Sequence, residues 1–527
     1  MTLRRVIACT AALGALMVAA PAWAEKLTIG LASEATAVDP HFHNLTPNNM
    51  IAAHVYDALI GQDDKQRLIP GLATEWKPID DTTWEFTLRK GVTFHDGTPF
   101  TADDVVCTWE RAPNVPNSPS SYGTYTKGKT IEKVDDYTIH VKTEKPYPLV
   151  PNDISTVYIV SSESGCDAST EEFNDLSAAH GTGPFIITAY EPGSVISLRR
   201  NDDYWGDKPQ WEEVDLKPIK SAPSRVAALL AGDVDMIDGV PTTDIETLKK
   251  RDDLTLSQGS SNRVIYLHMD QFREDSPHVT AKDGGKIKNP LLDQRVRLAI
   301  SKAINRDAIV DRVMEGVAIP AGQLLPDGFF GVSENLEVME YDPEAAKALL
   351  EEAGYGDGFK MTIHGPNDRY INDAKIAEAI GQMLTRIGIE TAVETMPRSV
   401  YFKRASRGGE GDQPEFSFIL VGWGAGSGEA SSPLKSLIHS YDKDRGFGAS
   451  NRGRHSDAEI DTLIEDALAT VDDAKRQDML AKATEMAMEN VGIIPLHYQV
   501  NTWAAKKGIT YPARTDEHTR AAKVVKE

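Results

Sequence analysis

Cysteine is scarce in this sequence, and its scarcity excludes one class of site. Only three cysteines occur in 527 residues, and two of them, Cys107 and Cys166, lie beyond the N-terminal segment. No CxxC motif or Cys/His cluster is present, which excludes a structural zinc site of the common kinds. In an oxidising compartment Cys107 and Cys166 could form a disulfide. Spacing does not show whether their Cα atoms come within reach, so the bonded and the free states both stay open.

Positive charge is also in short supply. The chain carries 56 Lys and Arg against 79 Asp and Glu, a formal net charge of −23 at pH 7. A surface of this sign repels phosphate backbones and anionic lipid headgroups, and it favours solubility. Nucleic acid is therefore not an expected partner.

Long apolar runs are confined to the first 24 residues. Arg4 and Arg5 precede the apolar segment 6–20, and "PAWA" at 21–24 offers small residues at a cleavage site. This order is typical of a secretory signal peptide. No later segment approaches the ~18 unbroken apolar residues that a membrane-spanning helix needs. We therefore expect residues 1–24 to be removed and the protein to be periplasmic.

The segment "GVTFHDGTPFTADDV", residues 91–105, concentrates a histidine and three aspartates and so resembles an active site at first sight. His95 and Asp96 share one turn and lack a third partner to orient a base. Asp-Gly is a strong hairpin signal, because the glycine supplies the positive φ that the turn needs. Thr101, followed three residues later by Asp104, predicts a helix capping box. We interpret the segment as architecture, not as a catalytic site.

Strand-like and helix-like segments alternate along the chain, which predicts an α/β fold of more than one domain. Residues 360–365, 371–389 and 391–396 form a strand–helix–strand unit, and such a unit implies parallel strands. Other strands are expected at 26–32, 82–89, 415–423 and 491–505, and as a pair within 181–206; helices are expected at 49–60, 101–112, 289–304 and 342–355, and a helix followed by a strand at 225–240.

Several motifs carry a family likeness over essentially the whole chain beyond residue 24. Together with 91–105, they resemble the large extracellular solute-binding proteins of the peptide/nickel class, family 5, which serve ABC importers. In order, the further motifs are "GLATEW" (71–76), "GTGPF" (181–185), "RNDDYWG" (200–206), "LLAGDVD" (229–235), "VRLAISKAINRDAI" (296–309), "AKALLEEAGY" (346–355) and "GIIPLH" (492–497).

This resemblance implies a fold and a set of partners. The fold is that of a periplasmic binding protein (type II-like, Venus-flytrap), with two α/β lobes and an extra subdomain in the first. The ligand is buried between the lobes by hinge closure, and a permease/ATPase complex in the inner membrane receives it. The protein would be a monomer without a cofactor and without catalysis. The expected divisions are a signal peptide at 1–24, lobe I at 25–270 with a subdomain at about 58–180, lobe II at 271–489, a return to lobe I at 490–527, and hinge crossings near 264–275 and 488–498.

The same resemblance suggests where ligand contacts lie: the loop after the first strand, the strand before the hinge, and loops of lobe II. A structural role competes for several of them, because Tyr266 and His268 also suit a core, Arg369 and Arg398 a charged surface, and Glu429 a helix cap. The candidates are Glu34, Phe42, His43, Asn262, Tyr266, His268, Asn367, Arg369, Tyr370, Arg398, Trp423, Gly426 and Glu429.

One departure from the family pattern concerns the ligand's charge. Peptide binders of this family usually carry an Asp three residues after the Trp of a Gly-Trp motif, where it pairs with the peptide's α-ammonium; here Gly426 stands there. A buried ammonium without a carboxylate is costly. Either Glu429 or Glu34 takes over, or the ligand is not a free peptide. Peptide remains the default, with opines, modified amino acids, oligosaccharides and a nickel complex as alternatives.

Two further segments near candidate contacts have alternative interpretations. "HFH" at 41–43 puts two histidines on one face of an extended segment, which suits a metal such as nickel but supplies no third ligand. "GAGSGE" at 424–429 lacks the spacing of a dinucleotide-binding loop. Its glycines would let a ligand or the opposing lobe approach the backbone.

A secreted hydrolase is the rival function. No H-E-x-x-H, G-x-S-x-G or S-x-x-K constellation stands where a hydrolase would need it. A chemoreceptor-linked or chaperone-like binder on the same fold stays open as a third possibility.

Overall fold

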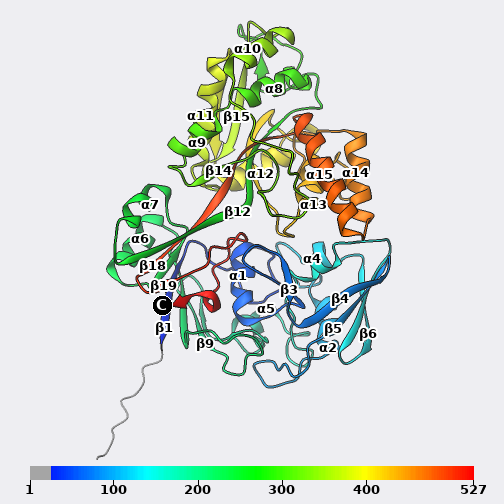
Figure 1. Ribbon diagram of the computed structural model, residues 1–527, viewed down its shortest axis with the longest axis vertical. Coiled ribbons are helices and arrows are strands. Elements are labelled where there is room, and N and C mark those ends of the chain that lie inside the picture. The colour runs from blue at the N-terminus through cyan, green and yellow to red at the C-terminus, as the bar shows by residue number, and fades with distance from the viewer. Residues whose placement is uncertain (1–24) are drawn as a thin grey trace, which may run out of the picture.

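The computed structural model describes residues 25–527, so the expected signal peptide lies outside the described residues. Two α/β lobes are joined by two long antiparallel strands, β12 (Leu254–Met269) and β18 (Ile494–Lys506) (Figure 1). We call the part that contains the N-terminal strand and the C-terminus lobe I, and the part above the crossing strands in Figure 1 lobe II. Within residues 25–527 no helix has both the length and the apolar character needed to cross a bilayer.

A twelve-stranded sheet runs through both lobes in the order β13–β15–β17–β12–β18–β11–β1–β10–β9–β8, with β14 beside β18 and β16 beside β15. In lobe I the N-terminal strand is parallel to β10 and β11, and β8 and β9 form the expected hairpin. The lobe I elements are β1 (Lys26–Leu31), β8 (Phe185–Glu191), β9 (Val195–Arg200), β10 (Glu213–Pro218), β11 (Met236–Asp238), β19 (Ile509–Thr510), β20 (Val525–Lys526), α1 (Thr46–Val55), α5 (Thr170–Asn174), α6 (Ala222–Ala231), α7 (Thr242–Lys249) and the short turn η4 (Ala521–Lys523).

Lobe II contains the strand–helix–strand unit that the sequence predicts, and β15 and β16 are parallel, as expected. Its strands are β13 (Val279–Thr280), β14 (Ala318–Pro320), β15 (Phe359–Pro366), β16 (Ile389–Met396) and β17 (Phe418–Gly424). Its helices are η1 (Pro290–Leu292), α8 (Gln294–Lys302), α9 (Arg306–Arg312), α10 (Pro343–Glu352), α11 (Asp373–Arg386), α12 (Arg398–Arg407), η2 (Glu410–Asp412), α13 (Ser431–Pro433), η3 (Leu434–Ile438), α14 (Ala458–Ala469) and α15 (Asp473–Glu489).

A separate four-stranded antiparallel sheet, β4–β5–β7–β6, lies at one side of lobe I (Figure 1). Cys107 of α2 forms a disulfide with Cys166, and their Cα atoms are 5.9 Å apart. The disulfide joins α2 to a loop of lobe I that lies 59 residues further along the chain. The elements of this part are β2 (Ile60–Gln62), β3 (Leu68–Pro70), β4 (Ala73–Asp80), β5 (Thr83–Leu88), β6 (Lys129–Asp135), β7 (Thr138–Thr143), α2 (Ala102–Arg111), α3 (Gly123–Thr126) and α4 (Val150–Ile154).

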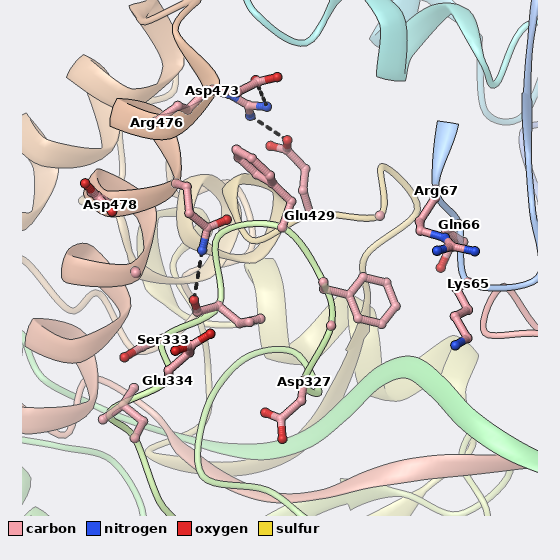
Figure 2. Close-up of a pocket in the computed structure, with 18 of the residues that line it drawn as sticks. Lys65, Gln66, Arg67, Asp327, Ser333, Glu334, Glu429, Asp473, Arg476 and Asp478 are labelled. Carbon is pink, nitrogen blue, oxygen red and sulfur yellow. Dashed lines mark hydrogen bonds and ion pairs between the residues drawn. The ribbon is translucent and has the colours of Figure 1, made fainter. Parts of the chain in front are cut away.

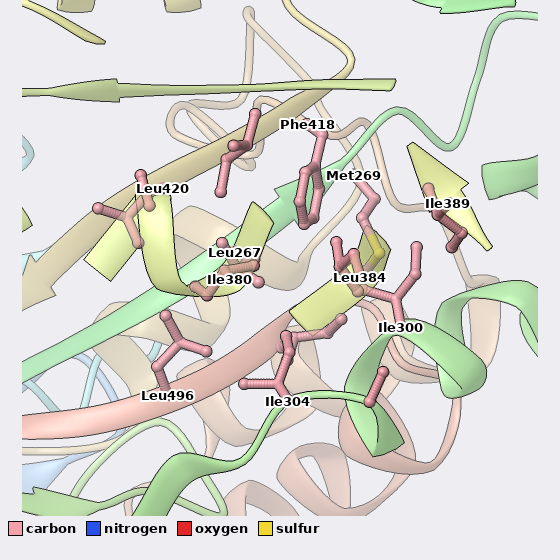
Figure 3. Close-up of a cluster of buried hydrophobic side chains, with 14 of the residues drawn as sticks. Leu267, Met269, Ile300, Ile304, Ile380, Leu384, Ile389, Phe418, Leu420 and Leu496 are labelled. Carbon is pink, nitrogen blue, oxygen red and sulfur yellow. The ribbon is translucent and has the colours of Figure 1, made fainter. Parts of the chain in front are cut away.

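The crossing strands are anchored in the core of each lobe. In lobe II, Leu267 and Met269 of β12 and Leu496 of β18 pack against α11 and β17 side chains such as Leu384 and Phe418 (Figure 3). In lobe I, the buried Trp503 of β18 belongs to the cluster that packs around β1 and α1. The other end of β12 reaches lobe I through Leu254 and Leu256, which are partly buried against a second cluster around α6 and α7. Each strand therefore has one end in each lobe.

Pairing between the crossing strands is interrupted between the lobes. The ladder shifts register between Ser260 and Val264, and again between Ile265 and Tyr266. Such irregularities bend a strand locally. The first shift lies just before the hinge segment expected at 264–275. The residues inside this first shift, 261–263, are polar. Their side chains bind other parts of the chain instead of packing into either core.

The Asp-Gly hairpin and the capping box predicted for 91–105 are both confirmed. The Phe94 N–H donates to the Thr98 carbonyl at 2.8 Å, and Gly97 adopts a φ of 88°. Thr101 caps α2, and its own backbone N–H donates to the Asp104 carboxylate at 2.7 Å. This stretch is a turn that leads into a helix.

His95 holds the glycine motif at 181–185 in place. Its Nε2–H donates to the Gly183 carbonyl at 3.0 Å, and its Nδ1 accepts from the Gly181 N–H at 3.3 Å. This pattern requires the neutral ring, and burial lowers the pKa of His95 to about 4. A Cβ on Gly181 would overlap the Val55 carbonyl, so only glycine fits there.

The aromatic motif at 200–206 contacts the same region, next to the glycine motif at 181–185. The half-buried Asp57, just after α1, accepts hydrogen bonds from Thr182, Tyr204 and Trp205. α1 ends at Val55, before the expected residue 60, and so leaves the Val55 carbonyl and Asp57 for these contacts. Three family motifs therefore serve one structural junction.

His95→Gln tests this assignment, because glutamine keeps a donor but does not titrate. The native pKa of about 4 lies below the ordinary 6.5. The unfolded chain therefore binds the proton more readily, and stability is lost as pH falls from about 6.5 toward 4. We expect the free energy of unfolding of the variant to depend less on pH in that interval, by up to about 1.4 kcal/mol per pH unit. Urea unfolding at several pH values measures this, and equal slopes would contradict a neutral His95.

Candidate functional site

A cavity of about 1080 Å³ lies between the lobes, beside the crossing strands (Figure 2). Lobe I contributes residues 65–68 of the β2–β3 turn and Asn152 of α4. Lobe II contributes the loop 327–336, residues 428–429 and the first turns of α15. The cavity therefore has one wall on each lobe, as a site closed by lobe movement requires.

The two walls differ in charge. The lobe II wall carries the exposed carboxylates of Asp327, Glu334 and Asp478, and the lobe I wall carries Lys65 and Arg67 (Figure 2). Arg67 is already paired with a carboxylate of its own hairpin at 2.7 Å. Opposed walls of opposite sign suit a solute that carries both charges.

Glu429 is the one predicted ligand contact that lines this cavity, and its charge is already compensated. The buried Arg476 of α15 donates to Glu429 at 2.5 Å and to Asp473 at 3.2 Å, and its guanidinium lies over the Phe330 ring (Figure 2). Burial raises the pKa of Glu429, and Arg476 opposes that rise. Glu429 caps no helix and is not a free carboxylate.

A second group of charged side chains lies where β12 crosses between the lobes. Arg263 donates through Nε and Nη2 to Glu517 of the C-terminal segment, at 2.9 and 3.0 Å. Burial alone would raise the pKa of Glu517, but the Arg263 guanidinium holds it below its ordinary value. Sequence reasoning missed this pair, because its members are 254 residues apart and neither belongs to a motif.

Arg369 is a neighbouring cation without a carboxylate partner. Burial, and next the Arg263 cation, lower the pKa of Arg369, and Arg398 adds to the same effect. The Arg369 guanidinium lies 5.0 Å from the centroid of the Tyr370 ring. Among residues 25–527 no carboxylate forms an ion pair with Arg369 or Arg398. An anionic group would therefore be favoured here.

Two predicted contacts from the strand before the hinge lie in the core of lobe II. Tyr266 and His268 are buried, and their rings pack edge to face with centroids 5.1 Å apart. Burial lowers the pKa of His268 to about 3. We therefore do not keep either residue among the proposed ligand contacts. The third, Asn262, lies at the break in β12, where its amide bonds to Gln66 and to the Ala425 carbonyl.

The predicted contacts of lobe II on β17 and near α11 differ in exposure. Tyr370 is buried and donates to the Gly422 carbonyl at 3.0 Å. Trp423 is half-buried, with Nε1 at 3.3 Å from Ser432 Oγ. Asn367 and Arg398 are exposed, and so is Gly426, where an added Cβ would meet open space.

The predicted contacts of lobe I lie after β1. Glu34 forms an ion pair with Lys220 at 2.7 Å, and this hydrogen bond lowers the pKa of Glu34. Phe42 and His43 are half-buried, and His43 Nδ1 lies 3.0 Å from Thr36 Oγ1. Like Glu429, Glu34 already has a cationic partner.

The two histidines at 41–43 do not act together. His41 is buried, its Nε2 lies 2.8 Å from the Tyr158 carbonyl, and its Nδ1 accepts from Arg111 at 3.0 Å. Burial lowers the pKa of His41 to about 4. Both nitrogens are occupied, which corrects the nickel hypothesis for this segment. Within the described part of the chain, no group of three His, Cys, Asp or Glu could hold a metal.

Arg476→Met tests whether Glu429 is held by the protein itself. Removing one partner of a buried ion pair leaves the other charge uncompensated, so we expect the free energy of unfolding of lobe II to fall by about 3–5 kcal/mol. The double variant Glu429→Gln/Arg476→Met should recover part of this loss. Chemical denaturation of the solute-free protein measures both. A stability equal to wild type in Arg476→Met would instead leave Glu429 available to a ligand cation.

The chain is similar to proteins of a known family over most of its length. The model of the bacterial extracellular solute-binding proteins, family 5 (middle region), matches residues 67–445. The glutathione-binding protein GsiB of Pectobacterium atrosepticum is 28% identical over 491 residues, covering 92% of this chain and 91% of the relative. The dipeptide-binding protein of Escherichia coli is 30% identical over 448 residues, covering 79% of this chain and 78% of the relative.

Solved structures superpose on nearly the whole chain. HbpA2 from Haemophilus parasuis superposes with a TM-score of 0.81 at 25% identity, over 95% of this chain and 100% of that chain. DppA from Helicobacter pylori, in complex with the peptide STSA, gives 0.75 at 24% identity, over 95% and 98%. The expected fold of two α/β lobes with an additional subdomain in the first is confirmed.

Proposed function

The chain belongs to the bacterial extracellular solute-binding proteins of family 5, and from this premise we propose that it captures a small solute between its lobes and delivers it to an ABC importer. The observation that carries the proposal is the cavity of about 1080 Å³ with one wall on each lobe. A solute that touches both walls stabilises the closed arrangement by its differential affinity for it. The importer can then recognise the closed form.

The cellular setting follows from the same proposal. The protein acts in the periplasm as a monomer after loss of residues 1–24, and its partners are the permease and ATPase of the inner membrane. It releases the solute chemically unchanged. We keep the division into lobe I (25–270), lobe II (271–489) and the returning segment (490–527), with a subdomain at about 58–180.

We propose that the solute carries an anionic group that meets Arg369 and Arg398. Both cations lack a carboxylate partner among the described residues, and burial makes the Arg369 charge costly while it stays unpaired. Buried, half-buried and exposed side chains complete the proposed contact set with the Gly426 backbone, and of this set Glu429 lines the cavity. The proposed contacts are Glu34, Phe42, His43, Asn262, Asn367, Arg369, Tyr370, Arg398, Trp423, Gly426 and Glu429.

The class of solute is peptide or peptide-like by default, since the names of two relatives specify glutathione and a dipeptide. Glu34 and Glu429 each have a cationic partner, and Gly426 offers no carboxylate. A free ammonium at Gly426 would therefore be unpaired. This favours a solute whose amine is absent or modified, or lies at the acidic wall of Asp327, Glu334 and Asp478. Opines, modified amino acids, oligosaccharides and a metal complex that brings its own ligands remain alternatives.

The deciding experiment is mass spectrometry of the small molecule that co-purifies with the protein, followed by calorimetry with that molecule. Saturation at 100 times the Kd should stabilise the protein by about 2.7 kcal/mol. Chromatography of the recovered solute after long incubation tests the hydrolase alternative. Catalytic conversion of the solute would overturn the proposal.

Arg369→Ala tests the anion contact. Loss of a hydrogen bond to a charged group costs about 1.5–3 kcal/mol, so the Kd for the co-purified solute, or for glutathione as a first probe, should rise roughly 10- to 100-fold. Arg386→Ala, at the far end of the helix that follows Arg369, is the matched control and should leave the Kd unchanged. Titration calorimetry measures both. An unchanged Kd in Arg369→Ala would remove Arg369 from the site.

A further inference from the structure

Gln66 adopts a backbone conformation that its residue type disfavours. It lies in the turn between β2 and β3, its φ is 59°, and it is only 4% exposed. The left-handed region is strained for a glutamine, and strain of this kind persists where surrounding contacts determine it. The contacts that hold Gln66 therefore indicate what the turn is built to do.

The Gln66 side chain joins four separate parts of the chain. Its Oε1 accepts from Asn262 Nδ2 at 2.8 Å and from Thr515 Oγ1 at 3.2 Å. Its Nε2 donates to the Gly426 carbonyl at 3.3 Å. One amide thus connects a turn of lobe I, the break in β12, the C-terminal segment and the glycine-rich loop of lobe II.

Two other amides bind the same loop. Asn262 Nδ2 donates to the Ala425 carbonyl at 3.1 Å, and Asn152 Nδ2 donates to the Ser427 carbonyl at 2.9 Å. Three consecutive carbonyls, 425 to 427, therefore each accept from a different amide side chain. Two of these amides belong to lobe I, and the third lies at the crossing.

Glycine at 428 lets the loop come this close. Gly428 has a φ of 72°, and a Cβ built on it would lie 3.0 Å from the Gln66 carbonyl oxygen. A side chain at 428 would push the loop away from the turn. The loop and the turn are therefore shaped for contact with each other.

We propose that Gln66, with Asn152, forms a latch that positions the loop 424–429 against lobe I and so sets the population of the closed form. Gln66 is a positioning residue in this role, since it acts through the loop backbone. Neutral amide–carbonyl bonds give a small net gain over their bonds to water, so the latch can open to admit a solute. This inference deepens the proposed function. It rests on that function only in assuming that closure serves to capture a solute.

Gln66→Glu is the most specific test of the latch, because the glutamate side chain has the same shape as glutamine. The glutamate keeps an acceptor for Asn262 and Thr515 but replaces the donor to the Gly426 carbonyl with an oxygen that repels it. Asn152→Asp makes the same change at the Ser427 carbonyl. Gln62→Glu is the matched control, since Gln62 lies in the same hairpin and its amide donates to Ser155 within lobe I.

The distance between the lobes is the readout, measured between spin labels at Lys145→Cys and Lys475→Cys. Both positions are exposed, one beside the four-stranded sheet and one in the first turn of α15. The oxidised protein is unfolded in denaturant and refolded to remove any bound solute. We expect wild type and Gln62→Glu to show the short distance, and Gln66→Glu to lower the closed-to-open ratio about tenfold.

Gln66→Gly separates the latch from folding, because glycine relieves the strained φ while removing the side chain. It should fold with a melting temperature near that of wild type and still show the longer distance. Wild-type distances in both Gln66 variants, or an equal shift in Gln62→Glu, would overturn the latch. These distances are measured without solute, so they test the latch even if no solute binding is found.

Discussion

The constraint on which the rest of this structure depends is that two hydrophobic cores share two strands. β12 and β18 each enter the core of lobe I at one end and the core of lobe II at the other. Movement of one lobe against the other must therefore be absorbed where the ladder between them is broken, near Ser260–Val264. Polar side chains at that break bind segments of both lobes and the C-terminal segment, as Asn262 does with Gln66 and Ala425 and Arg263 does with Glu517.

Local chemistry explains why much of the fold was predictable from sequence. The Asp-Gly turn, the Thr101 cap and the β15–α11–β16 unit each depend on residues close together in the chain, and all three are confirmed. The same rules identified His95 of the 91–105 segment as structural. Its partners, Gly181 and Gly183, belong to a second motif that sequence placed in order but not in contact.

Pairing between residues far apart in the sequence was not predictable in this way. Arg263 with Glu517, Glu429 with Arg476, and Gln66 with Asn262 and Gly426 all join residues far apart in sequence. No local rule connects them, so the sequence indicated Glu429, Asn262 and Gly426 as ligand contacts without their partners in the chain. Of the contacts that the family likeness suggested, Glu429 lines the cavity, while the lobe I wall and the C-terminal segment carried no motif to mark them.

These ion pairs restrict the charge that a solute can carry more than the number of charged side chains in the crevice does. Positively and negatively charged side chains are both numerous here. A buried charge that already has a partner, however, gains little free energy from a ligand, and breaking its ion pair is costly. Glu429 is paired in this way with Arg476, and Arg263 with Glu517, whereas the ion pair of Glu34 with Lys220 is more exposed. What remains for a solute is the unpaired Arg369 and Arg398 near the crossing and the exposed acids of the outer wall. A solute whose anionic end faces the hinge satisfies that arrangement, whereas one that buries a free ammonium at Gly426 does not.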